Sequence, residues 1–249
     1  MAADLSFDPN EVAVLVPAAG KGQRLGGTPK QFRMLGEHLL LVQVLLLFEQ
    51  HPAVGHLVVA APSGQVGEVT HRLRAEGLST LTAVVEGGED RQGSVRHALR
   101  AVPESVQTVL VHDAARPFVS AAQVHSVVQA IQAKGAASLA VPVADTLRRG
   151  ANSVFGETVP REDLYRMQTP QGARRDWLEE AHRRGAQGAE TATDDVALLQ
   201  KAGHDVHLVQ GHRRNFKITS PQDWALAQQR WATWRDDPDR LTLASSDST

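Results

Sequence analysis

Five short apolar runs constrain the fold of this chain most strongly. They are near-continuous rather than alternating, as in strands that are covered on both faces of a sheet. Segments with the length and period of helices lie between them. The pattern predicts strands at Val12–Val16, His56–Ala60, Leu81–Val85, Thr108–Val111 and Ala137–Val143, and helices at His38–Gln50, Gln65–Glu76, Arg91–Ala101 and Ser120–Lys134. This alternation predicts a three-layer, Rossmann-like α/β fold with a mostly parallel sheet and right-handed crossovers.

The alternation of apolar strands and helices ends after the fifth run. Residues 145–165 are polar and hold one weak strand, Val154–Val159, which predicts a β-arm that projects from the sheet. Further elements are predicted at Arg174–Arg184 (helix), Asp194–Ala202 (helix), Asp205–Gln210 (strand) and from Ser220-Pro221 onward (helix). Ser and Pro are favoured at the N-cap and the first helical position, respectively. We expect one domain over residues 11–234, with flexible tails at 1–10 and 235–249.

The last predicted helix carries three Trp residues and an Ala at spacings of three, four and three. They are Trp224, Ala227, Trp231 and Trp234. Such spacing places them on one face of a helix. We interpret this face as packing, not as a binding surface.

Composition excludes several classes of protein. Among the 249 residues, Lys and Arg total 26 and Asp and Glu total 28, a net charge of −2 that argues against a dedicated nucleic-acid-binding protein. The chain has no Cys, so it has no disulfide or thiolate site, which suits a cytoplasmic protein. Residues 1–10 lack the charge and apolar core of a signal peptide. The longest apolar stretch, near Leu39–Phe48, is too short for a membrane span of about 20 residues.

A glycine-rich segment follows the first predicted strand and extends to Gly27. Such a turn brings backbone N–H groups close to phosphates. The segment does not match the P-loop, because no Gly is followed by Lys-Ser or Lys-Thr. Gly20, Gly22 and Gly26 are spaced one residue too far apart for the dinucleotide-binding fingerprint. A simple strand-to-helix turn would explain the glycines, but not the nearby cations Arg24 and Lys30, which favour an anionic ligand.

Seven motifs in order resemble one family of nucleotidyltransferases. They are Pro17-Ala18-Ala19-Gly20 with Pro29-Lys30-Gln31, Gly87 to Val95, Val111 to Pro117, Asp145-Thr146, Gln168 to Gln171, Thr193-Asp194-Asp195 and Asn215 to Thr219. Together they resemble the 2-C-methyl-D-erythritol 4-phosphate cytidylyltransferases of the non-mevalonate isoprenoid pathway. The resemblance covers roughly residues 11–230 and implies a nucleotidyltransferase sheet.

The resemblance implies a cytidylyl transfer from CTP to 2-C-methyl-D-erythritol 4-phosphate, with release of pyrophosphate. It also implies Mg²⁺ bound with CTP and a homodimer formed through the arm. Two alternatives remain open. One is a cytidylyltransferase for another polyol phosphate, such as ribitol 5-phosphate, and the other is a non-catalytic nucleotide-binding module.

The resemblance also assigns site residues. The catalytic residues implied are Arg24, Lys30, Arg161 and Lys217. Nucleotide binding is implied for Pro17, Ala18, Ala19, Gly20, Gly22, Gly87, Gly88, Arg91, Ser94, Asp113 and Ala114. Binding of the polyol phosphate is implied for Asp113, Arg116, Thr146, Arg161, Thr169 and Lys217. The metal ligands stay unassigned.

Purely structural roles are also open for several of these residues. Asp113 and Arg116 could be a buried pair that holds a turn, and Ser94 could be a local helix cap. Arg161 follows an atypical Val159-Pro160, so that Arg166 is a rival for its role. Asp194 and Asp195 are equally consistent with a structural and a functional role.

Overall fold

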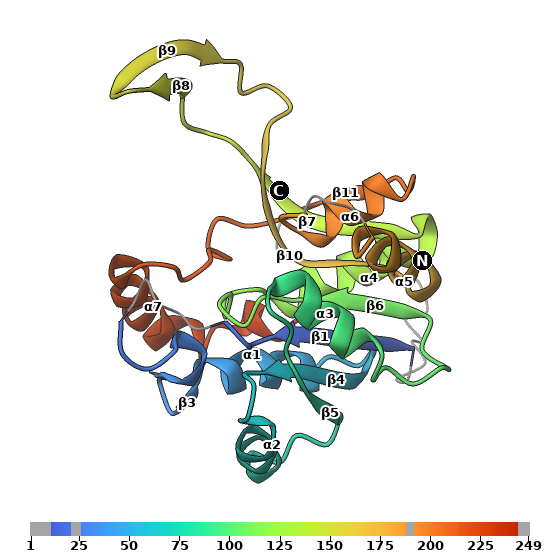
Figure 1. Ribbon diagram of the computed structural model, residues 1–249. Coiled ribbons are helices and arrows are strands. Elements are labelled where there is room, and N and C mark those ends of the chain that lie inside the picture. Colours follow the sequence, from blue (N-terminus) through green and yellow to red (C-terminus); the bar gives the residue numbers. More distant parts are fainter. Residues whose placement is uncertain (1–10, 21–25, 188–191, 244–249) are drawn as a thin grey trace, which may run out of the picture.

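The computed structural model describes residues 11–20, 26–187 and 192–243. In these residues the centre of the fold is a seven-stranded sheet of order β11-β7-β10-β6-β1-β4-β5 (Figure 1). Its strands are β1 (Val12–Pro17), β4 (Val54–Ala61), β5 (Leu81–Glu86), β6 (Thr108–Val111), β7 (Ala136–Pro142), β10 (Tyr165–Arg174) and β11 (His207–Gln210). All neighbouring pairs are parallel except those of β10, which is antiparallel to both β6 and β7. The predicted mostly parallel sheet is confirmed.

Helices cover both faces of this sheet. On one face lie α1 (Leu40–Glu49), α2 (Val66–Ala75) and α4 (Ala121–Lys134), which share an apolar core with the sheet. On the other face lie α3 (Arg91–Leu99), α5 (Arg175–Gly185) and α6 (Asp195–Lys201). The Ser120 and Gln123 side chains form a capping box that starts α4, as the sequence predicts. The three-layer architecture is therefore confirmed.

Strand β10 was not predicted, although it lies in the middle of the sheet. Its sequence contains a Pro and a Gly, which argue against a central strand. The structure accommodates both. Pro170 falls in an irregularity of the ladder with β7, between Met167 and Gln171. A Cβ at Gly172 would lie 2.6 Å from a carbon of Leu110, so the absence of a side chain permits close packing here.

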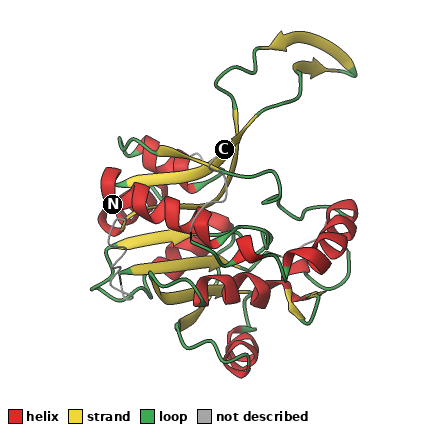
Figure 2. Ribbon diagram, turned by 180° about the vertical axis from the view of Figure 1, so that it is seen from behind, coloured by secondary structure: helices red, strands yellow, loops and turns green. Residues whose placement is uncertain are grey.

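The predicted arm is a β-hairpin that projects away from the sheet in both views (Figures 1 and 2). It consists of β8 (Leu147–Ala151) and β9 (Val154–Val159), which pair antiparallel. Asn152 and Ser153 connect them with φ values of 50° and 61°. Two residues with positive φ match the type I′ turn that suits the twist of a hairpin. The hairpin is exposed along most of its length.

The C-terminal region forms a smaller core beside the sheet. Helix α7 (Pro221–Trp234) begins with Ser220 as N-cap, and it buries Ala227, Trp231 and Trp234 against other apolar side chains. The sequence predicts a flexible tail from residue 235, but part of that segment is folded. A 3₁₀ helix, η3 (Pro238–Arg240), places the guanidinium of Arg240 5.3 Å from the centre of the Trp231 ring. An Arg over a Trp face is attracted by the ring electrons, which explains this packing.

Smaller elements complete the chain. A 3₁₀ helix, η2 (Lys30–Phe32), precedes a short hairpin of β2 (Met34–Leu35) and β3 (His38–Leu39). This pairing delays the start of α1 to residue 40, two residues later than predicted. Across the described part of the chain, every helix is too short or too polar to traverse a lipid bilayer.

Candidate active site

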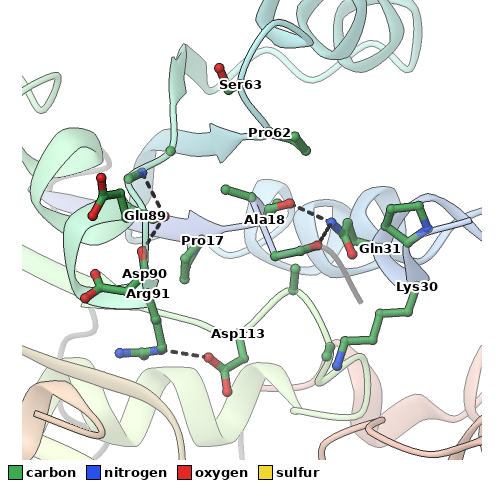
Figure 3. Close-up of a pocket in the computed structure, with 18 of the residues that line it drawn as sticks. Pro17, Ala18, Lys30, Gln31, Pro62, Ser63, Glu89, Asp90, Arg91 and Asp113 are labelled. Carbon is green, nitrogen blue, oxygen red and sulfur yellow. Dashed lines mark hydrogen bonds and ion pairs between the residues drawn. The ribbon is translucent and has the colours of Figure 1, made fainter. Parts of the chain in front are cut away.

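A cleft of about 1180 Å³ opens at the carboxyl ends of the central strands (Figure 3). Open α/β sheets bind ligands at this edge, where the loops after neighbouring strands converge. The loops after β1, β4, β5 and β6 line the cleft, together with η2 and the segment before α7. This volume exceeds that of a typical site for one small ligand.

One buried side chain, Gln31, fixes the described start of the glycine-rich loop after β1. The amide Nε2 of Gln31 donates to the carbonyl oxygens of Ala18 at 2.7 Å and Gly20 at 2.8 Å (Figure 3). Both N–H groups of this amide are used, so two loop carbonyls are turned toward Gln31. In a trans peptide the N–H points opposite to the carbonyl. The described start of the loop, residues 18–20, is thereby held in one orientation, as a phosphate cradle requires.

The loop between β5 and α3 forms the second wall of the cleft. Asp90 caps α3 by accepting from Gly93 N at 2.6 Å. The hydroxyl of Ser94 accepts from Gly88 N at 3.1 Å and donates to Asp90 O at 2.8 Å. A Cβ at Gly87 would lie 2.2 Å from that of Ala19, so only Gly allows the two loops to approach this closely. Ser94 therefore acts as a local brace for a loop that lines the cleft.

Asp113, just beyond β6, is a carboxylate in the cleft that three cations surround. Its Oδ1 lies 3.2 Å from Arg91 Nε, and its Oδ2 lies 2.9 Å from Lys217 Nζ and 3.5 Å from Arg116 Nε. Burial would raise the pKa of Asp113, but the cations Arg91, Lys217 and Arg116 outweigh it and hold the pKa well below its usual range. Asp113 is thus ionised and organises three cations around one carboxylate. The buried-pair interpretation of Asp113 and Arg116 holds, and Asp113 faces the cleft as well.

Two lysines approach the cleft from different parts of the chain. Lys30, on η2, donates from Nζ to Ile218 O at 2.6 Å, and Lys217 is the residue before Ile218. Figure 3 shows Lys30 and Arg91 on two sides of Asp113. The segment that carries Lys217 is anchored because Ile218 N donates to Ala115 O at 2.9 Å. Cations separated by almost 190 positions are in this way brought to one site.

Arg116 and Thr169 lie behind the cleft rather than in its lining. Arg116 donates to Asn215 O at 2.8 Å and Met167 O at 3.2 Å, which ties the β6 loop to β10 and to the Lys217 segment. The hydroxyl of Thr169 accepts from Asp113 N at 3.1 Å. Both residues therefore hold Asp113 and Lys217 in place within this chain.

The arm residues stand apart from the cleft of their own chain. Thr146 and Arg161 are exposed at the base of the hairpin, and neither lines the cleft. Arg161 donates to the Ala144 carbonyl. Its rival Arg166 lies on β10, also outside the cleft lining.

Twelve predicted site residues line the cleft. They are Pro17, Ala18, Ala19, Gly20, Lys30, Gly87, Gly88, Arg91, Ser94, Asp113, Ala114 and Lys217. Gly22 and Arg24 lie outside the described residues, so their predicted roles stay predictions. The structure thus brings together the nucleotide side of the predicted site more completely than the side for the second substrate.

Two features of the site were missed from the sequence. Gln31 ends the Pro29-Lys30-Gln31 motif, which by itself predicts no role for the amide, and only its contacts reveal that it fixes the carbonyls of Ala18 and Gly20. Asp195 is fully buried, and its Oδ2 lies 2.7 Å from Arg91 Nη1. Asp194 caps α6 by accepting from Ala197 N at 3.0 Å. A Thr-Asp-Asp sequence signals the cap, but nothing in it reveals the partner of the second carboxylate.

Fold and site together define an α/β nucleotidyltransferase: a glycine-rich loop after the first strand, facing cations, at the carboxyl edge of a mostly parallel sheet. Comparison with known families gives the particular one. Residues 12–231 match the 2-C-methyl-D-erythritol 4-phosphate cytidylyltransferase family, and the chain belongs to it.

Individual relatives agree with this assignment. The chain is 70% identical over 238 residues to 2-C-methyl-D-erythritol 4-phosphate cytidylyltransferase of Salinibacter ruber, covering 96% of this chain and 100% of the relative. It is 46% identical to that of Deinococcus radiodurans, covering 87% and 88% of the two chains. The crystal structure of the enzyme from Thermus thermophilus superposes with a TM-score of 0.74 at 37% identity, covering 87% of this chain and 96% of that one.

Proposed function

We propose that this chain transfers the cytidylyl group of CTP to 2-C-methyl-D-erythritol 4-phosphate, forming 4-diphosphocytidyl-2-C-methyl-D-erythritol and pyrophosphate. The observation that carries the proposal is the convergence of Lys30, Lys217 and Arg91 on one cleft beside the glycine-rich loop. Both substrates are anions, so a catalyst must first hold like charges together. Retention of both lysines in the cleft favours catalysis over mere nucleotide binding.

The chemistry asks for positioning and charge, not for a strong base. A phosphate oxygen of the polyol phosphate attacks the α-phosphorus of CTP, and the bond from this phosphorus to the oxygen bridging to the β-phosphate breaks. The attacking phosphate is already ionised at neutral pH. Lys30 and Lys217 stabilise the charge that builds on the α-phosphate oxygens, and Arg24 is proposed to join them. Preorganised donors of this kind supply much of the rate enhancement in such sites.

The two walls of the cleft divide the nucleotide between them. The backbone of Ala18 to Gly20 faces the triphosphate. The tight 87–94 loop takes the base and ribose, where its closely packed glycines leave room for a single pyrimidine ring and reject a purine by size. Arg91 and Asp113 lie between these walls.

We propose Mg²⁺ as the companion of CTP. Among the described residues, no group of three or more His, Cys, Asp or Glu could hold a metal ion. Mg²⁺ commonly keeps several waters and binds through one or two carboxylates plus substrate phosphates, so a cleft with few carboxylates is compatible with it. The oxygens of Asp113 are paired with Arg91, Lys217 and Arg116, so the substrate phosphates and water would hold the ion, with Asp113 contacting it through water. The bound ion would neutralise phosphate charge.

We also propose a homodimer through the arm and a cytoplasmic location. Thr146 and Arg161 are exposed at the base of the arm and away from the cleft of their own chain. An arm that reaches a second copy would carry them to the polyol-phosphate side of the partner's cleft. The cytoplasmic location is supported by a chain without Cys.

Mixing two inactive variants tests the shared site. In a hybrid of Arg161→Ala and Lys30→Ala chains, one of the two sites would have both Lys30 and Arg161. Random mixing should then restore roughly a quarter of wild-type activity, since about half of the dimers are hybrids with one intact site. No recovery in a verified dimer would contradict the sharing.

The central test is pyrophosphate release from CTP. We expect release with 2-C-methyl-D-erythritol 4-phosphate and much slower release with ribitol 5-phosphate at equal concentration. A preference for ribitol 5-phosphate would change the substrate, and no release with either would overturn the enzymatic proposal.

A further inference from the structure

A line of hydrogen-bonded charged and polar side chains runs from the cleft into the protein interior. It begins with Lys217 and Asp113, continues through Arg91 to Asp195, and ends at His182 on α5. The joining distances are 2.9 Å from Lys217 Nζ to Asp113 Oδ2, 3.2 Å from Asp113 Oδ1 to Arg91 Nε, 2.7 Å from Arg91 Nη1 to Asp195 Oδ2 and 3.0 Å from Asp195 Oδ1 to His182 Nε2. Only its first three members line the cleft.

The inner end of this line is sealed from solvent. The Asp195 side chain is 0% exposed and that of His182 is 1% exposed. The pKa of Asp195 lies below its usual range, because the Arg91 and His182 contacts outweigh the effect of burial. An ionised carboxylate only accepts hydrogen bonds, so His182 Nε2 carries the hydrogen. His182 therefore supplies the second side-chain donor that fixes this carboxylate.

The carboxylate in turn sets the direction of Arg91. A guanidinium is planar with donors in a rigid fork, so two anchored nitrogens determine where the third one points. Nε is anchored by Asp113 and Nη1 by Asp195, whereas Nη2 makes no hydrogen bond to other described residues. Arg91 lines the cleft and its side chain is 26% exposed, so part of this side chain is accessible to a ligand.

We propose that His182 is a positioning residue for nucleotide binding: through Asp195 it holds Arg91 in the orientation that contacts CTP. The proposal rests on the function proposed above and names a residue outside every motif that led to it. A buried His that only packs would stabilise the fold without affecting the affinity for CTP. Loss of the Nε2 donor, by contrast, lets the Asp195 carboxylate rotate and moves the plane of the guanidinium.

Three substitutions separate these roles. His182→Leu removes the donor while keeping a similar volume, and His182→Asn keeps polarity but is too short to reach Asp195. His182→Gln places an amide N–H near the position of Nε2. We expect His182→Leu and His182→Asn to weaken CTP binding about tenfold, because hydrogen bonds to buried charges are among the strong ones. His182→Gln should restore affinity to within about twofold of the wild type.

Calorimetric titration of the full chain with CTP and Mg²⁺ measures the affinity, and steady-state kinetics give KM for CTP and for the polyol phosphate. The KM for CTP should rise and that for the polyol phosphate should stay unchanged. His51→Leu is the matched control, because His51 is similarly buried but lies beside His125 of α4, on the opposite face of the sheet from α5. It should leave CTP affinity unchanged.

A double-mutant cycle completes the test. In an Arg91→Met background, His182→Leu should cause no further loss of CTP affinity, since the route through Arg91 is already cut. An equal further loss there, or unchanged CTP affinity in both His182→Leu and His182→Asn, would overturn the proposal. Wild-type protein that binds CTP but releases no pyrophosphate would overturn the proposed enzymatic function instead, and the binding comparison for His182 would still decide its role.

Discussion

The cleft and the arm use the same kind of ion pair in opposite surroundings. In the arm, Arg149 Nε and Glu157 Oε1 lie 2.9 Å apart with side chains 72% and 73% exposed. Behind the cleft, Arg91 and Asp195 lie at a similar 2.7 Å, but their side chains are 26% and 0% exposed. Exposed pairs contribute little because water competes and side chains remain mobile, whereas buried pairs are costly to break. Ion pairs of similar length thus have different energetic roles: the cleft is preorganised, and the arm is not.

The strongest way to break this comparison is to remove a cation from the cleft. Lys30→Ala should lower kcat by about a hundredfold while the fold persists, because one preorganised donor to the transition state is lost. Pyrophosphate release measures the rate, and circular dichroism checks the fold. The matched control is Lys134→Ala, at an exposed lysine on the last turn of α4, which should leave kcat unchanged.

The next effect concerns the support of the glycine-rich loop. Gln31→Met keeps the volume but leaves the carbonyls of Ala18 and Gly20 without their donor, so we expect kcat/KM for CTP to fall roughly tenfold. Gln43→Met is the control, since the buried amide of Gln43 donates to Leu35 O at 2.9 Å, outside the cleft lining. It should reduce stability without changing kcat/KM. Equal kinetic effects of the two changes would show that Gln31 is not special to the cleft.

Local patterns in the sequence predict much of this fold. Strands covered on both faces have near-continuous apolar sequences, so β1 and β6 could be located closely. The Ser120 capping box is a local signal of the same kind. Strand β10 was missed because Pro170 and Gly172 are unfavourable in a central strand, and only their tertiary contacts accommodate them there.

Site residues divide along similar lines. Cations beside a glycine-rich loop point to phosphate, so Lys30 could be assigned from its neighbourhood in the sequence. His182 could not, because its role depends on Asp195, which the fold brings to it from another helix. Side-chain pairings between separate elements are set by packing, and a single sequence carries no direct trace of them.

Acid should weaken the cleft wall before it affects the arm. His112 is buried below the cleft, where its Nε2 donates to Arg116 O at 3.0 Å and its Nδ1 accepts from the Thr169 hydroxyl at 3.1 Å. Burial lowers the pKa of His112 from 6.5 to about 4. Between about pH 6.5 and 4, His112 therefore binds a proton in the unfolded chain but not in the folded chain. The free energy of unfolding falls as the pH falls through this range.

Urea unfolding at pH 6.5 and 5 measures this loss. For His112 alone we expect the free energy of unfolding to fall by about 1 kcal/mol per pH unit. His51 and His125, whose pKa values are also lowered by burial, contribute in the same direction. The His112→Gln variant should therefore show a shallower dependence on pH than the wild type. Identical slopes would contradict a neutral, buried His112.

The smallest effect is expected in the arm itself. Arg149→Ala should change the free energy of unfolding by less than about 0.5 kcal/mol and leave kcat unchanged, because the pair with Glu157 is exposed at both ends. Urea unfolding of the variant, compared with Glu157→Ala and the double variant, isolates the pair from other effects of each change. A coupling energy above about 1.5 kcal/mol would be too large for an exposed pair. It would mean that this part of the hairpin is desolvated in solution, and would place it within the interface of the proposed dimer.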